Sequence, residues 1–156
     1  MNTDYICSKA SQKLWIIRRL KKYKLDEYKL LDVYEKEVRS VLEYAVPVWH
    51  SGLTHHQSNQ IERVQKQALR IILDQNYINY EVACTIFSIE PLYLRRIQLC
   101  INFAKTDLKR KQSLFLKAPN NSLTRRVPKL VKELKCRTKR YQNSSMPYLS
   151  KLINNQ

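Results

Sequence analysis

The sequence predicts an all-α protein: a small bundle of about four to five helices and a basic, partly irregular C-terminal tail that ends in a short helix. The 156 residues include one glycine but ten tyrosines, a composition unlike that of a turn-rich β-sandwich. Hydrophobic residues make up 44% of the chain, which is enough to form a buried core. We expect a helical domain over residues 1–108 and a basic tail over residues 109–156.

The first helix is predicted from Asp4 to about Tyr23. Apolar residues at helical spacing mark its inward side: Ile6, Ala10, Leu14, Ile17 and Leu20. Three cations gather around Trp15 on the other side: Arg18, Arg19 and Lys22. Two interpretations stay open for this face. It is a solvated basic surface whose tryptophan packs on a neighbour, or it contacts phosphates while the tryptophan stacks on a base or sugar.

A second helix is predicted from Glu27 to Tyr44, with Asp26 as its cap and these residues inward: Leu31, Tyr34, Val38, Val41, Leu42 and Ala45. Its many carboxylates are interpreted as a solvated face or as partners of first-helix cations, because none stands in a recognisable acid–base arrangement. Pro47 should bend or stop this helix, and Gly52 can take the positive φ that a tight turn after it needs.

Thr54 and Gln57 have the spacing of a capping box and should start a third helix. Its predicted apolar stripe consists of Ile61, Val64, Ala68, Ile71 and Ile72. The opposite face carries a basic row at positions i, i+3 and i+7, namely Arg63, Lys66 and Arg70. Such a row is common on solvated helix surfaces, and it would also suit contacts to phosphates.

The rest of the chain contains three further predicted helices. A short one spans about Tyr80 to Phe87, and another runs from Leu92, just after Pro91, to about Leu108. The inward residues of the longer helix are predicted to be Ile97, Ile101, Ala104 and Leu108. A short terminal helix is predicted over Pro147 to Ile153.

The charge is concentrated at the two ends of the chain. Residues 1–24 carry a net charge of +6, residues 25–108 carry −2, and residues 109–156 carry +12. This distribution indicates a polyanionic partner, and it favours nucleic acid over a membrane surface. Tail cations therefore join the helix faces as candidate contacts: Arg125, Arg126, Arg137, Lys139 and Arg140.

Patterns typical of catalysis, cofactors and metals are missing. His50, His55 and His56 match no usual zinc spacing, and one glycine cannot form a phosphate-binding loop. Four scattered cysteines without a C-x-x-C pair favour free thiols in a reducing compartment. No apolar run reaches the roughly 20 residues of a membrane span. We expect a protein of the nucleus or cytoplasm that is neither secreted nor bound to membranes and uses no cofactor or metal.

Three blocks of the chain resemble one protein family in order and spacing. They read C-S-K-A-S-Q-K-L-W-I-I-R-R-L-K-K, R-S-V-L-E-Y-A-V-P-V-W-H-S-G-L-T and I-E-R-V-Q-K-Q-A-L-R-I-I. The ending K-C-R-T-K-R-Y-Q-N-S-S-M-P-Y-L-S-K-L-I-N is similar to the close of the same reading frames. The family is the reverse transcriptases of jockey- and CR1-like non-LTR retrotransposons. The matching region is the polymerase thumb and the segment after it.

This resemblance implies a helical thumb that grips a template–primer duplex of RNA and DNA through its backbone. The family's RNA-directed DNA polymerase holds Mg²⁺ with palm aspartates, including a pair in the F/Y-x-D-D motif. No Asp-Asp pair occurs in this chain. The palm, fingers and endonuclease would lie upstream of Met1, so a non-catalytic remnant is expected, with RNA or an RNA–DNA duplex as its partner.

Two alternatives stay open. The apolar faces could belong to a helical interaction module that packs on a polymerase palm or another protein. The stretch from Ala10 to Leu53 also resembles the N-terminal domain of an AlkB-homologue alkylation-repair protein, although the chain has no H-x-D…H iron triad. The second alternative is a decayed copy of a transposable element without a function.

Overall fold

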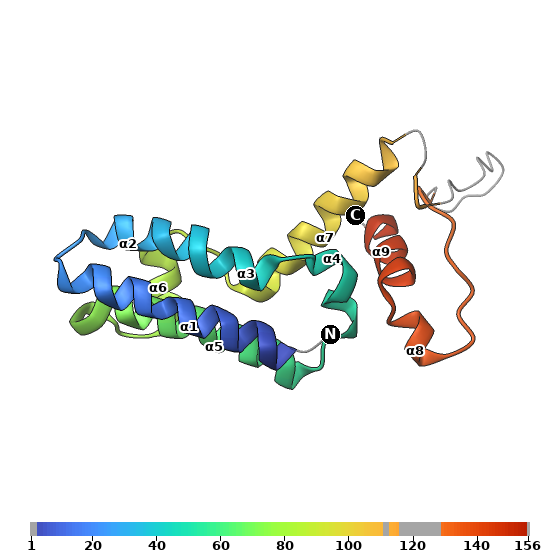
Figure 1. The fold of residues 1–156 in the computed structure, drawn as a ribbon. Coiled ribbons are helices and arrows are strands. Elements are labelled where there is room, and N and C mark those ends of the chain that lie inside the picture. The colour runs from blue at the N-terminus through green and yellow to red at the C-terminus, as the bar shows by residue number, and fades with distance from the viewer. Residues whose placement is uncertain (1–2, 111–112, 116–128, 156) are drawn as a thin grey trace. The chain divides into compact units, whose positions relative to one another are not determined.

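Helices make up the secondary structure in the computed structural model, which describes residues 3–110, 113–115 and 129–155 (Figure 1). No β-strand occurs within those ranges. The predicted all-α class is therefore confirmed. The chain forms two compact units, one of Met1–Tyr44 with Thr54–Arg95 and one of Ala45–Leu53 with Arg96–Gln156. The predicted domain boundary lies at residue 108. The observed division differs from it, because residues 45–53 and 96–108 pack with the tail.

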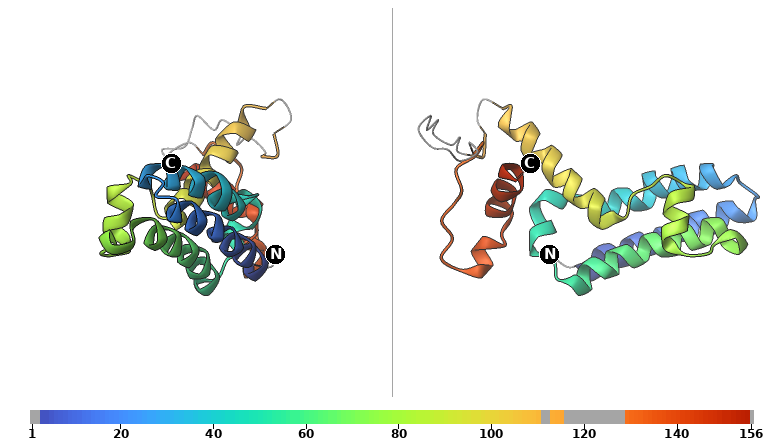
Figure 2. Two further views of the ribbon diagram at one scale, coloured as in Figure 1. Left: turned by 60° about the vertical axis from the view of Figure 1, so that its left-hand side comes forward. Right: turned by 180° about the vertical axis from the view of Figure 1, so that it is seen from behind.

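The first unit is built on two long parallel helices, α1 (Thr3–Lys22) and α5 (His55–Leu73), which lie side by side (Figure 2). Gln60 Nε2 donates a 3.1 Å hydrogen bond to Asp4 at one end of the pair. At the other end, Lys21 Nζ donates to the carbonyl oxygens of Ile71 at 2.6 Å and Ile72 at 2.9 Å. These carbonyls lie in the last turn of α5, where a cation is favoured by the helix dipole.

A third layer of this unit runs antiparallel to α1 and consists of α2 (Glu27–Val33), the π-helical turn η1 (Tyr34–Arg39) and α3 (Ser40–Glu43). Asp26 caps α2 by accepting a hydrogen bond from the amide of Tyr28, as predicted. An ion pair of 2.8 Å between Lys13 and Glu37 joins this layer to α1. The core between the layers is apolar and includes Leu14, Ile17, Leu30, Val38, Leu42, Ile61, Leu69 and Ile72.

The π-helical turn corrects part of the predicted inward face. A π turn is wider than an α turn, so side chains that follow it are rotated relative to those of a uniform α-helix. Tyr34, Val38 and Leu42 are fully buried, as predicted. Val41 is only partly buried and Ala45 is exposed, although the α-helical period placed both inward. The error at Val41 follows from assuming a uniform period of 3.6 residues. The error at Ala45 has another cause, because α3 ends at Glu43 and Ala45 lies in the left-handed region.

The start of α5 and the elements after it complete the first unit. Thr54 and Gln57 form the predicted capping box, with the Gln57 amide 3.2 Å from Thr54 Oγ1. The apolar stripe is buried as predicted except at Ile71, which is partly exposed. The turn η3 (Asp74–Asn76), the helix α6 (Tyr80–Ile86) and the beginning of α7 (Leu92–Leu108) follow. Asn79 caps α6 through the amide of Val82.

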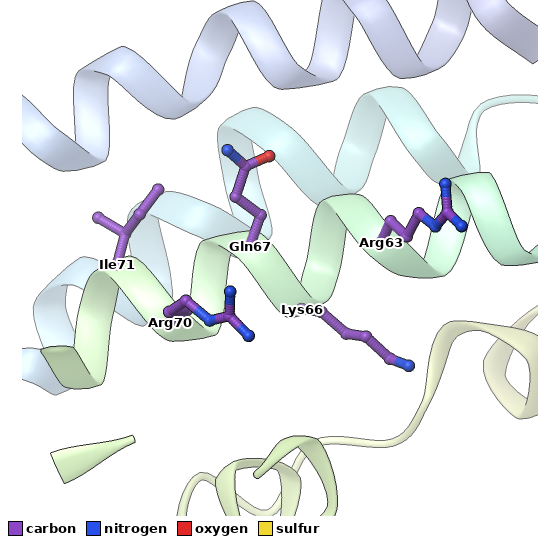
Figure 3. A pocket seen from close by; sticks show the side chains of 5 residues that line it. All are labelled: Arg63, Lys66, Gln67, Arg70 and Ile71. Atoms are coloured by element: carbon purple, nitrogen blue, oxygen red, sulfur yellow. The ribbon is translucent and has the colours of Figure 1, made fainter. Parts of the chain in front are cut away.

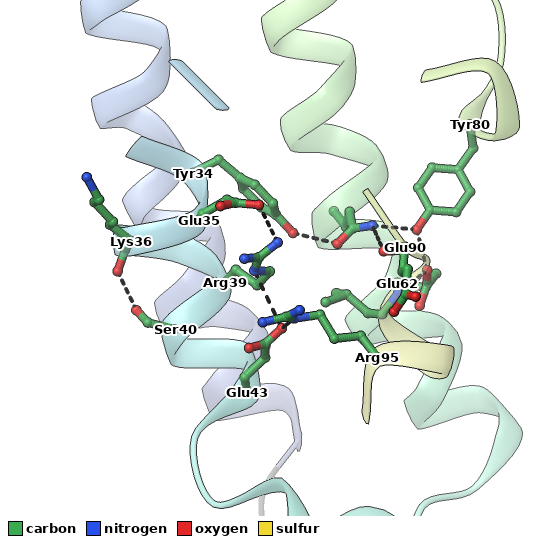
Figure 4. A network of polar contacts seen from close by, with 12 residues as sticks. Tyr34, Glu35, Lys36, Arg39, Ser40, Glu43, Glu62, Tyr80, Glu90 and Arg95 are labelled. Carbon is green, nitrogen blue, oxygen red and sulfur yellow. Dashed lines mark hydrogen bonds and ion pairs between the residues drawn. The ribbon is translucent and has the colours of Figure 1, made fainter. Parts of the chain in front are cut away.

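A buried polar network joins these elements (Figure 4). The hydroxyl of Tyr34 donates to Gln65 Oε1 at 2.7 Å, and Gln65 Nε2 donates to Tyr80 Oη at 2.9 Å and to the carbonyl of Glu90 at 3.1 Å. Glu62 accepts from the hydroxyl of Tyr80 and, at 3.0 Å, from the amide of Leu92. Gln65 thus links four segments of the unit from a position that is only 1% exposed.

The second unit contains α4 (Val46–Trp49), the 3₁₀ turn η2 (His50–Gly52), α7 from Arg96 onward, α8 (Lys139–Gln142) and α9 (Ser145–Asn154). The chain packs α9 against α4 and η2. The side chain of Asn154 binds the backbone of Val131 twice. Asn154 Oδ1 accepts from the Val131 amide at 3.0 Å, and Asn154 Nδ2 donates to the Val131 carbonyl at 2.9 Å. The terminal helix is confirmed and begins two residues earlier than predicted.

Two predictions for this unit are wrong in detail. Ile97 and Leu108 are only partly buried, whereas Arg96 and Asp107 are each 1% exposed. Hydrophobic periodicity cannot identify a buried charged residue, so it missed these positions. Gly52 does not take a positive φ, whereas Ala45 does so at φ 52° and ψ 30°. Helix α3 ends at Glu43, before Pro47, which lies in the first turn of α4.

The role of Gln65 predicts a large loss of stability when its amide is removed. Gln65→Leu should lower the free energy of unfolding by about 2–4 kcal/mol, because it leaves buried hydroxyl and carbonyl groups without partners. Gln67→Leu, an exposed position on the same helix, should change it by less than about 0.5 kcal/mol. Urea unfolding measures both, and equal losses in the two variants would contradict the assigned role of the network.

The backbone at Ala45 and Gly52 predicts a paired effect. Ala45→Gly should stabilise the protein by up to about 1 kcal/mol, because alanine is strained in the left-handed region. Gly52→Ala should also stabilise it, by about 0.4–1 kcal/mol, since an added Cβ meets no atom within 4 Å and the unfolded chain loses freedom. Thermal melts of the two variants test this. Destabilisation by Gly52→Ala would show that Gly52 needs a conformation that only glycine adopts.

Candidate nucleic-acid interface

The predicted basic row forms a continuous exposed face on α5. Arg63, Lys66 and Arg70 are all exposed on the side of the helix opposite its buried stripe. With Gln67 and Ile71 they line an open hollow of about 440 Å³ (Figure 3). Seven residues of helix rise about 10 Å, a length over which one strand of a duplex carries about three phosphates. The row therefore has the extent needed to contact successive phosphates.

Two tyrosines hold cations of this row in place. The Nζ atom of Lys66 lies 5.0 Å from the ring centre of Tyr80, and the Cζ atom of Arg70 lies 5.2 Å from that of Tyr77. The buried network fixes the hydroxyl of Tyr80, and burial together with the Glu62 hydrogen bond raises the pKa of Tyr80 so that it stays neutral. Sequence reasoning missed both tyrosines, because tertiary packing of the next segment brings them beside α5.

The predicted cations of α1 form a second exposed face. Arg18, Arg19 and Lys22 are exposed, and Trp15 among them is 61% exposed. The guanidinium of Arg19 lies 5.9 Å from the ring centre of Tyr23. Lys21 differs from its neighbours, since it turns inward to the last turn of α5 and lies 3.5 Å from Asp74.

The tail cations form a third group, which belongs to the second unit. Arg137, Lys139 and Arg140 are exposed at the beginning of α8, whose cap Thr138 accepts from the amide of Tyr141 at 3.2 Å. Arg125 and Arg126 lie outside the described residues. The second unit has fifteen Lys and Arg residues against two acids, a net charge of +13, and the first unit has fourteen against eleven, a net charge of +3.

Acidic side chains pair with a different set of cations. Five cations of the first unit form ion pairs, namely Lys13, Lys21, Lys36, Arg39 and Arg95. Arg39 bridges Glu35 and Glu43, and Glu43 also accepts from Arg95, a chain of contacts drawn in Figure 4. None of the nine described candidate cations pairs with an acid in residues 3–110, 113–115 or 129–155. Their charge is therefore available to an external anion.

The histidines and two of the cysteines occupy exposed or packed positions that do not form a shared site. His55 and His56 lie exposed in the first turn of α5, as expected, whereas the His50 ring packs 5.7 Å from that of Tyr148. Burial raises the pKa of the Cys100 thiol to about 11, and it also raises the pKa of the Cys84 thiol.

Within the described part of the chain, no three His, Cys, Asp or Glu side chains are grouped as a metal site requires. No described helix has the length and apolar character of a membrane span.

Comparison of the chain with protein families, with curated proteins and with solved structures gives no match. The arrangement of the exposed cations on α1, α5 and α8 is therefore the main indication of function in this chain.

The environment of His50 predicts an unusual titration. Burial and, secondarily, the positive charge of Arg96 lower the pKa of His50 to about 4. Below the ordinary pKa of about 6.5 the unfolded chain binds a proton that the folded chain does not, so stability should fall as the pH drops from about 6.5 to about 4. NMR titration of the histidine ring protons measures this directly, with His50→Gln to assign the signal. A His50 pKa near 6.5 would contradict the packed position of the ring.

Proposed function

We propose that this protein binds nucleic acid without catalysis, through phosphate contacts made by exposed cations on rigid helices. The observation that carries the proposal is the separation of cations into two sets. Cations that hold the fold together pair with carboxylates or carbonyls, whereas those of the α5 row and the α1 face have no acidic partner among the described residues. A polyanion can bind the second set without breaking contacts that stabilise the fold.

The α5 row, Arg63, Lys66 and Arg70, is the part best suited to a regular backbone. Its helix is fixed by the capping box at one end and by Lys21 at the other. Two of its three cations rest against tyrosine rings, so little side-chain freedom remains to be lost on binding. Contacts of this kind position a protein on a nucleic acid and carry little sequence information.

The second unit adds charge over a longer range. Its net charge of +13 raises the local concentration of a polyanion and speeds its capture, most strongly at low salt. Attraction of this kind needs no fixed geometry, in contrast to the row on α5.

The resemblance to the thumb region of non-LTR retrotransposon reverse transcriptases agrees with this proposal in partner and in mode of binding. A thumb grips an RNA–DNA duplex through its backbone, so we propose that duplex as the partner. The chain contains no Asp-Asp pair of the kind that holds the catalytic metals of that polymerase. Our proposal therefore assigns it binding and no nucleotidyl transfer.

Replacement of the α5 row tests the proposal. The triple variant Arg63→Gln, Lys66→Gln, Arg70→Gln should bind an RNA–DNA duplex at least about tenfold more weakly. The slope of log affinity against log salt should become shallower by about 3, because three phosphate contacts are lost. Fluorescence anisotropy at several salt concentrations between about 50 and 200 mM measures both quantities.

A matched control removes three charges elsewhere. Lys9, Lys29 and Lys105 are exposed cations outside the candidate groups, and their replacement by Gln should leave the slope within about 1 of that of the wild type. Circular dichroism confirms that both triple variants keep their helices. Two results would contradict the proposal: no duplex binding by the wild type at the lowest salt, or an affinity that does not depend on salt.

A further inference from the structure

The side chain of Trp15 stands out on the surface of the first unit. It is 61% exposed at the middle of α1, and it lies on nearly the opposite side of the helix from the fully buried Ala10 and Ile17. A large apolar ring in water lowers solubility and stabilises nothing. Packing within the first unit therefore does not explain its position.

The chemistry around Trp15 is cationic. Arg18 and Arg19 lie one turn further along the same face, and Lys22 lies two turns along, about 10 Å away. All three are exposed, and none pairs with an acid in the described ranges of the chain. An aromatic ring beside several cations is the arrangement by which proteins bind single-stranded nucleic acid, with stacked bases and neutralised phosphates.

The aromatic rings beside the α5 row and the α1 face differ in whether a base could stack on them. The faces of Tyr77 and Tyr80 are taken by Arg70 and Lys66 of the α5 row. In the part of the chain that the structure describes, no cation or aromatic ring lies over the indole of Trp15. A base can therefore stack on Trp15 without displacing a protein side chain.

The helix under this face is held firmly on both flanks. Lys13 pairs with Glu37 on one side, and Lys21 binds the carbonyls of Ile71 and Ile72 on the other. These contacts fix the rotation of α1 about its axis. They leave Trp15 and its three cations directed away from the bundle.

We propose that the face of Trp15, Arg18, Arg19 and Lys22 is a binding site for single-stranded nucleic acid, in which an unpaired base stacks on the indole. This inference rests on the proposed function and refines it. Bases inside a duplex are stacked on one another and cannot cover a ring on a helix surface, so the partner here is an unpaired segment. The α5 row then serves the backbone of a duplex, and the α1 face serves a single strand.

Tryptophan fluorescence of the full chain provides the test. Trp15 is exposed and Trp49 is 8% exposed, so an added ligand should reach mainly Trp15. Single-stranded RNA or DNA of about 10 nucleotides should quench the emission as it binds, and Trp15→Phe should remove most of the quenched signal. Heparin, a polyanion without bases, should bind the same cations with little quenching.

Substitutions separate stacking from charge. Trp15→Ala should weaken single-strand binding by roughly 5- to 150-fold, the loss expected for one stacked base, and Trp15→Phe should restore part of the affinity. Duplex binding should be unchanged in both. Tyr28→Leu removes an exposed ring from the acidic layer and is the control, with no effect expected on single-strand affinity.

Each other outcome overturns a different statement. Single-strand binding that neither quenches the emission nor depends on Trp15 overturns the α1 site and leaves the proposed function standing. Equal quenching by heparin, or by an acidic peptide of the same charge, shows that the face binds anions without stacking. Absence of binding to both single strands and duplexes overturns the proposed function itself.

Discussion

The buried amide of Gln65 is the contact on which the geometry of the first unit depends. An amide side chain offers two kinds of hydrogen-bonding group, and here both are used, toward Tyr34 on one layer and toward Tyr80 and Glu90 on the other. The same residue lies next to Lys66 on α5, so the bonds that fix Gln65 also fix the rotation of the helix that displays the basic row. Tyr80 belongs to both arrangements, since its hydroxyl is in the network and its ring lies beneath Lys66. Polar groups in the core thus determine how charge is presented at the surface.

The positions of the carboxylates also determine where positive charge is exposed on the first unit. The acids of the layer formed by α2, η1 and α3 pair with cations close to them, notably Lys36 and Arg39. The pair of Lys36 with Asp32 is exposed and contributes little to stability, so its main consequence is the local neutralisation of charge. The ion pairs of this layer neutralise one side of the unit, whereas the candidate cations of the α1 face and the α5 row have no acidic partner among the described residues. A unit with a net charge of only +3 can therefore display two strongly basic faces.

Features set by neighbouring residues could be predicted from the sequence. The caps at Asp26 and Thr54 and the exposed row on α5 depend on spacings of two to seven residues, and each was found where the pattern placed it. Features set by packing could not. The π turn has no signature in the hydrophobic period, and neither do the buried charges of Arg96 and Asp107. Tyr77 and Tyr80 reach the basic row only because α6 folds back along α5.

The central claim is that nucleic acid binds to the α1 face and the α5 row of the first unit, whose cations have no acidic partner among the described residues. The measurement that tests it most directly is ultraviolet cross-linking of the full chain to a duplex with a single-stranded overhang, followed by mass spectrometry of the joined peptides. We predict adducts in the peptides around Trp15 on α1 and around Lys66 and Tyr77 on α5. Adducts confined to residues 113–155, or adducts in the acidic layer of residues 27–43, would contradict the claim.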